Sequence, residues 1–247
     1  MKLPGAVGAL RGLLKELQED ERKPLVVGGA HELARVLERD LARDGDASAV
    51  RIGDPTGGAV YVHLSTGSDA DVVALRRARR AHVPIVEVDA GVAEPLAAAR
   101  IAERIAARLG EDAAPLAGRL PLLRDPVCRR IIESFSRKNG IVGAAVFIPG
   151  VDLPVLALNQ VRMLLRLDQA YGLDLDPRER LPEILAVVGA GFGLRTVARE
   201  LLDLVPVAGW AVKGGVAYAG TRALGEAAVR RLQMTSGRAT AATAPNP

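Results

Sequence analysis

The sequence predicts two domains: an α/β domain with a mostly parallel sheet, followed by an all-α domain of glycine-rich helical hairpins broken by prolines. Three observations lead to this fold class. Short apolar runs alternate with helical patterns over residues 1–112. Two long apolar segments, 139–173 and 184–225, follow, and a proline turn at Pro149 or Pro206 interrupts each of them. With 247 residues, the chain can also bury the core of two small domains.

The α/β domain is predicted from alternating strand and helix patterns, which favour a parallel sheet. Leu33, Val36 and Leu37 are expected to face its core, and Ser68 with Asp69 caps one of its helices. In order, we predict a helix over 3–21, a strand over 25–27 leading into Gly28-Gly29, a helix over 31–41, strands over 49–52 and 59–64 separated by a turn, a helix from 68 to 81, a strand over 83–88 and a helix over 94–109.

The rest of the chain is predicted to be helical after a linker. Residues 113–126 are rich in proline and glycine and are expected to form that linker. The helical domain then covers 127–234, beginning with a helix over 127–138, and a disordered tail of small residues covers 235–247. Within this domain, Asp152 caps a helix over 154–171 and Gly172 fits its end.

Four polar side chains follow one face of the helix over 154–171. Asn159, Arg162, Arg166 and Gln169 recur at spacings of three and four, while apolar residues fill the other faces. We expect this helix to lie between water and apolar matter, which is either protein or lipid.

Gly189 and Gly193 resemble part of a dinucleotide-binding motif. That motif is G-x-G-x-x-G, whereas here the third glycine comes one position early. Two glycines four residues apart on a helix also allow a second helix to approach closely. Helix packing is therefore the preferred interpretation, and dinucleotide binding stays open as the alternative.

Charges in the apolar segments argue against simple membrane spans. A spanning helix needs about 20 mostly apolar residues, but Asp152, Arg162, Arg195 and Lys213 interrupt these segments. We expect the hairpins either to pack on each other in water or to dip into one leaflet.

Charge is unevenly distributed along the chain. Residues 1–118 carry a net charge of −2 and residues 119–247 carry +6. A basic, apolar half favours an anionic membrane surface or an acidic partner. Nucleic acid is not expected, because aromatic residues make up 3% of the chain and no recognition motif is present. The excess of arginine over lysine, together with frequent alanine, suggests a bacterial protein from a GC-rich genome. The single Cys128 and the absence of a signal-peptide pattern predict that it is cytoplasmic, with or without association with the inner membrane, and not secreted.

The order of elements resembles a degenerate small-GTPase domain. A GTPase has the phosphate loop G-x-x-x-x-G-K-[ST] after its first strand, but the stretch after Gly28-Gly29 has neither the lysine nor the hydroxyl residue. Asp89 alone stands where a GTPase has its guanine-reading motif. We therefore predict a GTPase-like or response-regulator-like shape without phosphate chemistry. The three histidines His31, His63 and His82 are too scattered to predict a metal site.

Several short motifs follow one another in the C-terminal half: 148–154, 160–163, Tyr171-Gly172, 191–195, 206–210 and 217–222. Together they resemble a family of unknown function that is often fused to small GTPases and whose YcjF-like members are regarded as inner-membrane proteins. The resemblance covers roughly residues 129–231. It implies a helical, membrane-associated or GTPase-associated module without known catalysis.

The preferred function is a non-enzymatic module with no cofactor. Its helical domain is expected to bind an anionic membrane surface or to form a homo-oligomer, and its α/β domain to bind a small GTPase or another protein. A nucleotide-binding protein (GTP, ATP or a dinucleotide) and a soluble helical scaffold are the alternatives. The sequence suggests no catalytic, cofactor or metal residues. Candidate interaction residues are Asp152, Asn159, Arg162, Arg166, Gly189, Gly193, Arg195 and Lys213.

Overall fold

The computed structural model of the chain describes residues 23–90, 97–145, 153–173 and 209–243. The chain divides into two compact units. The α/β unit comprises residues 15–130 and 169–173, and the helical unit comprises 1–14, 131–168 and 174–247. The helix predicted over 3–21, both proline turns, and the candidates Asp152, Gly189, Gly193 and Arg195 lie outside the described residues.

The sheet of the α/β unit has four strands, and every strand pair is parallel, in agreement with the predicted sheet. The strand order is β2-β1-β3-β4. Because β2 and β3 both run parallel to β1 on either side of it, residues 53–58 carry the chain back across the sheet and do not form a hairpin. The strands are β1 (Leu25–Gly29), β2 (Val50–Ile52), β3 (Val60–Ser65) and β4 (Ile85–Asp89).

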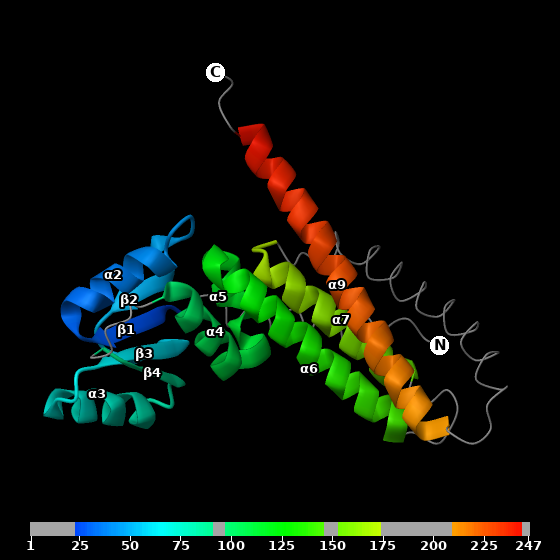
Figure 1. Cartoon of the computed structure of the whole chain (residues 1–247), viewed down its shortest axis with the longest axis horizontal. Helices are drawn as coiled ribbons and strands as arrows, with labels where there is room; N and C mark the ends of the chain where they lie inside the picture. Colours follow the sequence, from blue (N-terminus) through cyan, green and yellow to red (C-terminus); the bar gives the residue numbers. More distant parts are fainter. Residues whose placement is uncertain (1–22, 91–96, 146–152, 174–208, 244–247) are drawn as a thin grey trace. The chain divides into compact units, whose positions relative to one another are not determined.

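Helices cover both faces of this sheet. Helices α2 (His31–Leu41) and α4 (Ala98–Leu109) lie on one face, and α3 (Asp69–Arg80) lies on the other (Figure 1). In α2, Leu37 is buried as predicted, but Val36 is 47% exposed. The buried residues of α2 are Ala34, Leu37 and Leu41, which share one face at helical spacing, and Val36 lies off that face.

The segment 113–126 differs from the predicted linker. It contains α5 (Ala114–Arg119) and the short 3-10 helix η3 (Pro121–Leu123), preceded by η2 (Gly110–Ala113). Pro115 stands in the first turn of α5, where its missing N–H has no cost. Apolar residues three and four apart are buried along this segment: Ala113, Leu116, Ala117, Leu120 and Leu123.

Three long helices make up the described part of the C-terminal region: α6 (Arg124–Ala145), α7 (Leu153–Ala170) and α9 (Gly209–Thr243). Gly172 follows α7 with a φ of +70°, as its predicted end position requires. The segment expected to be a disordered tail continues α9 as far as Thr243, because alanine is frequent there and favours a helix. The Thr235 and Ser236 hydroxyls donate to the carbonyls of Arg231 and Leu232, one turn earlier.

Candidate functional site

The strand order places a switch point between β1 and β3. One connection leaves β1 toward β2 and the next leads to β3 on the other side. In open α/β sheets, ligands bind outside the carboxyl ends of the strands at such a point. Here that position is formed by Gly28 and Gly29 at the end of β1, by Ser65 at the end of β3 and by Thr66 directly after it.

The two glycines at this point are explained by packing against β3. A Cβ on Gly28 would lie 2.3 Å from the Tyr61 hydroxyl oxygen, so Tyr61 covers the space above Gly28. Gly29 has a φ of +96°, and a Cβ there would lie 2.0 Å from the Leu64 carbonyl oxygen. Both positions therefore need glycine for close approach of β1 and β3.

A buried chain of hydrogen bonds runs from β3 to the start of α3. The Tyr61 hydroxyl lies 3.0 Å from His63 Nδ1, and His63 Nε2 lies 3.0 Å from Asp71 Oδ1. Tyr61, His63 and Asp71 are 2%, 1% and 6% exposed. With so little access to solvent, this network can hold β3 and α3 together but cannot meet a substrate.

The Asp71 carboxylate completes a capping box with Ser68 at the start of α3. Asp71 Oδ2 accepts hydrogen bonds from the backbone N–H groups of Thr66 at 2.8 Å and Ser68 at 2.9 Å, and from the Thr66 hydroxyl at 3.2 Å. Burial raises the Asp71 pKa, but these hydrogen bonds and the neighbouring His63 outweigh it and lower the pKa to about 2. A permanent internal anion thus satisfies the donors at this helix start.

The remaining histidines lie elsewhere on the α/β unit. His31 is exposed and accepts a hydrogen bond from Arg35 Nε at 3.1 Å, and His82 is exposed with a φ of +55°. Among the described residues, no group of three His, Cys, Asp or Glu side chains is arranged to hold a metal ion.

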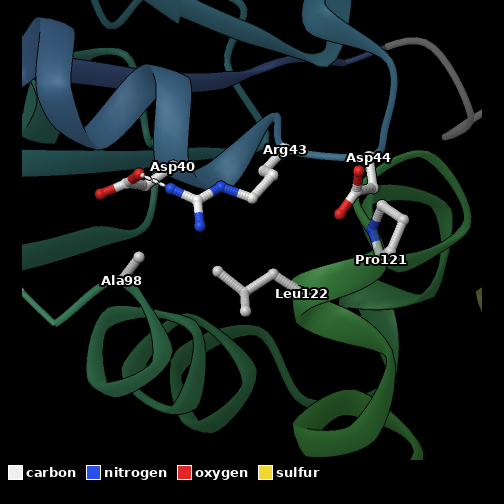
Figure 2. A pocket seen from close by; sticks show the side chains of 6 residues that line it. All are labelled: Asp40, Arg43, Asp44, Ala98, Pro121 and Leu122. Carbon is white, nitrogen blue, oxygen red and sulfur yellow. Dashed lines mark hydrogen bonds and ion pairs between the residues drawn. The ribbon is translucent and has the colours of Figure 1, made fainter.

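Two hollows lie along α2. The first, of about 250 Å³, is lined by Ala98, Pro121 and Leu122 on one side and by Asp40, Arg43 and Asp44 on the other. Figure 2 shows the Arg43 guanidinium reaching Asp40, and their atoms are 2.6 Å apart. The second hollow, of about 840 Å³, follows Arg35, Glu38 and Arg39 along the outer side of α2. No Ser, Thr or Cys side chain lines either hollow, so neither pairs a hydroxyl or thiol nucleophile with a base.

In the helical unit, glycines allow α6 and α9 to lie in close contact (Figure 1). A Cβ on Gly143 would lie 2.8 Å from the Ala217 Cβ, and one on Gly214 would lie 2.9 Å from the Gly140 carbonyl oxygen. This is the small-residue helix packing that the sequence suggested for Gly189 and Gly193, found at different glycines.

Buried polar contacts join α6 to both other helices. Asn139 Nδ2 donates to Thr221 Oγ1 on α9 at 2.9 Å, and Asn159 Nδ2 on α7 donates to Asn139 Oδ1 at 2.8 Å. Asn139 and Thr221 are 0% and 1% exposed. One turn before Asn139, Ser136 is also fully buried, and its hydroxyl has no hydrogen-bond partner among the described residues.

The helical unit has an end that is both apolar and basic, where α6 finishes and α7 and α9 begin. We call it the basic apolar end. Its cationic side chains include Lys138 and Lys213, and Arg162 lies farther along, at the middle of α7; all three are exposed. Residues 134–145, 153–167 and 209–225 contain no Asp or Glu, although Asp152 precedes α7 in the sequence. The exposed apolar side chains here are Ile141 (69%), Val155 (47%), Leu158 (38%) and Val216 (47%).

Four of the predicted interaction residues lie within the described part of the chain. Lys213 is exposed at the basic apolar end and Arg162 at the middle of α7, whereas Arg166 is half-buried. Asn159 is half-buried and donates a hydrogen bond to Asn139, and Gln169 is 3% exposed. The polar stripe predicted on this helix therefore faces solvent at Arg162 but not along its whole length.

Sequence reasoning missed the buried polar residues of both units. Asp71 stands three positions after the predicted cap Ser68, and this spacing is the signal of a capping box. Asn139, Ser136 and Thr221 carry no such signal, because a polar residue in an apolar helix does not reveal its partner far along the chain.

No helix in the described ranges combines the length and apolarity that crossing a membrane requires. The YcjF-like resemblance stays a prediction. Comparison of the chain with protein-family models, with curated proteins and with solved structures found no match.

Proposed function

We propose that this protein is a non-enzymatic module that binds anionic membrane surfaces through the basic apolar end of its helical unit, while its α/β unit binds a protein partner. One observation carries the proposal: four apolar side chains on three helices are exposed beside cations, in helical segments without carboxylates. The resemblance of the C-terminal half to a GTPase-associated family makes a small GTPase the first partner to test.

The energetics favour reversible surface binding. Moving the exposed half of a valine or isoleucine side chain out of water contributes about 1 kcal/mol. Each Lys or Arg near an anionic leaflet contributes about 1 kcal/mol and loses this contribution in high salt. Contributions of this size, from Ile141, Val216 and their cationic neighbours, support attachment to one leaflet.

The α/β unit supports the non-enzymatic part of the proposal. Its switch point is filled by Tyr61, and its helix-start donors already bind Asp71. A nucleotide phosphate would have to displace both groups. We therefore favour protein recognition over nucleotide binding for this unit, and equilibrium binding of GTP, ATP and NAD would reveal any nucleotide site.

Vesicle flotation tests the membrane proposal. The full chain is expected to float with vesicles of phosphatidylglycerol and phosphatidylcholine, to float poorly with phosphatidylcholine alone, and to be released by high salt. Val216→Glu should reduce flotation at least about tenfold, because a carboxylate is then placed at the anionic surface.

Val36→Glu is the matched control, because Val36 and Val216 are both 47% exposed but Val36 lies on the α/β unit. This variant should float as the original chain does. An unmodified chain that ignores anionic vesicles, or equal losses in both variants, would refute the proposal. If light scattering instead shows a soluble dimer that Val216→Glu dissociates, the basic apolar end is a self-association surface.

A further inference from the structure

Two of the three larger apolar side chains of helix α3 in the α/β unit are exposed to solvent, while the third, Leu75, is half-buried. Its inner face packs through the small residues Ala74 and Ala78 against Val26 and Tyr61 of the sheet. Val72 and Val73 on the outer side are 54% and 57% exposed. A surface helix normally buries its larger apolar residues, so folding of the α/β unit does not explain these valines.

Helix propensity also gives no reason for two exposed valines. β-Branched side chains lose rotamer freedom in a helix and are weaker helix formers than alanine. Val72 and Val73 are adjacent near the start of α3, so together they form one apolar spot rather than two scattered ones.

Arginines continue this outer side toward the end of α3. Arg76, Arg79 and Arg80 are exposed, and none of them forms an ion pair with a described residue. Arg77 contacts Asp54 at 3.1 Å. The carboxylates of α3 are both in its first turn, and Asp71 is buried there. The outer side of α3 thus changes from apolar to cationic along its length.

We propose that the outer side of α3, formed by Val72, Val73, Arg76, Arg79 and Arg80, is a docking surface for an acidic amphipathic helix of a partner protein. Charge complementarity selects this occupant: its apolar residues would cover the two valines, and its carboxylates would meet the arginines. The planar guanidinium group of arginine can bind a carboxylate through two parallel hydrogen bonds. This surface lies on the α/β unit and is additional to the proposed membrane attachment.

A lipid surface fits this face less well. Membrane-surface helices bury a broad apolar face with several large residues, whereas the outer side of α3 exposes two valines. The contact that the observations favour is therefore a protein helix, and vesicle binding becomes an outcome of the test.

The probe is a dye-labelled synthetic helical peptide with leucine on one face and glutamate on the others, and the readout is fluorescence anisotropy with the full chain. A peptide with lysine in place of each glutamate is the specificity control. We expect saturable binding of the glutamate peptide only. Arg76→Glu combined with Arg80→Glu should weaken it at least about tenfold, whereas Arg35→Glu combined with Arg39→Glu on α2 should change it less than about twofold.

A second variant separates docking from folding. Val72→Ala combined with Val73→Ala should weaken peptide binding, yet the variant should unfold at the same or a higher urea concentration, because alanine favours the helix. The proposal is overturned if the glutamate peptide does not bind, if the α2 variant loses as much affinity, or if the alanine variant keeps full affinity. It is also overturned if the α3 variants lose vesicle flotation instead of peptide binding.

Discussion

The side chain of Asn139 on α6 donates a hydrogen bond to the Thr221 hydroxyl on α9, with 2.9 Å between Nδ2 and Oγ1. Both residues are fully buried, and Asn139 also accepts a hydrogen bond from Asn159 on α7. A single amide therefore contacts all three described helices of the helical unit. In an apolar interior, such a contact favours one register of the helices over others.

Asn139→Leu should destabilise the helical unit by about 1–3 kcal/mol, because the buried hydroxyl of Thr221 and the amide of Asn159 lose their partner. Hydrogen exchange of the amides in α6 and α9, followed by mass spectrometry, measures this loss. Gln233→Leu on the exposed side of α9 is the control and should change exchange little. Equal protection in Asn139→Leu and the original chain would show that the contact adds nothing to stability.

Two glycine substitutions should have opposite effects. Gly143→Ala places a Cβ 2.8 Å from the Ala217 Cβ and should destabilise the α6–α9 contact by about 1–3 kcal/mol. Gly215→Ala meets no atom within 4 Å and should stabilise α9 by about 0.5–1 kcal/mol. Thermal unfolding followed by circular dichroism distinguishes the two. If both variants are stabilised, α6 and α9 do not pack as closely as described.

Much of the fold could be predicted because local patterns determine it. The helix over 31–41 and the strands β1 and β3 follow from apolar spacing and from the glycines and charges at their ends. The helices of segment 113–126 could not be predicted, because Pro115 and Gly118 are typical of loops. They are helical here because the leucines around them are buried in the core. Tertiary packing, rather than local propensity, gives that segment its helices.

Asp71→Asn should destabilise the α/β unit by about 1–3 kcal/mol, because an amide cannot accept the same set of hydrogen bonds as the carboxylate. Urea unfolding combined with hydrogen exchange of β3 and α3 measures the change. Asp69→Asn is the matched control: Asp69 is exposed in the same helical turn, and its loss should cost less than about 1 kcal/mol. Similar losses of unfolding free energy in both variants would mean that the buried hydrogen bonds of Asp71 stabilise the α/β unit no more than the exposed carboxylate of Asp69 does.

The unfolding free energy of the α/β unit should also depend on pH, because the protonation of Asp71 changes it. Its folded pKa of about 2 lies below the ordinary value of 3.8, so its contribution is complete above pH 4 and is lost as the pH falls toward 2. The shift corresponds to roughly 2 kcal/mol. The difference in unfolding free energy between the original chain and Asp71→Asn should shrink over this range. A difference that is independent of pH would contradict the assigned hydrogen bonds.

The candidate surfaces were harder to predict than the fold. The basic character of the C-terminal half is visible in the charge distribution, and Arg162 and Lys213 are exposed as a partner contact needs. The exposure of Val72 and Val73 could not be foreseen, because an apolar residue in a helical pattern is expected to face the core. Which face a helix buries depends on the volume available against the sheet, and here Ala78 is fully buried against the sheet while Val72 and Val73 stay exposed.

The basic apolar end can be tested directly with tryptophan fluorescence. Trp210 is the single tryptophan of the chain, so Trp210→Phe combined with Val216→Trp gives a chain whose one tryptophan stands at a position that is 47% exposed at this end. Vesicles of brominated phosphatidylglycerol quench tryptophans that reach the lipid. We expect the emission of this variant to be quenched by these vesicles, with the quenching reversed by high salt and absent with brominated phosphatidylcholine. Unchanged emission with the anionic brominated lipid would contradict the proposal that this end binds the membrane surface.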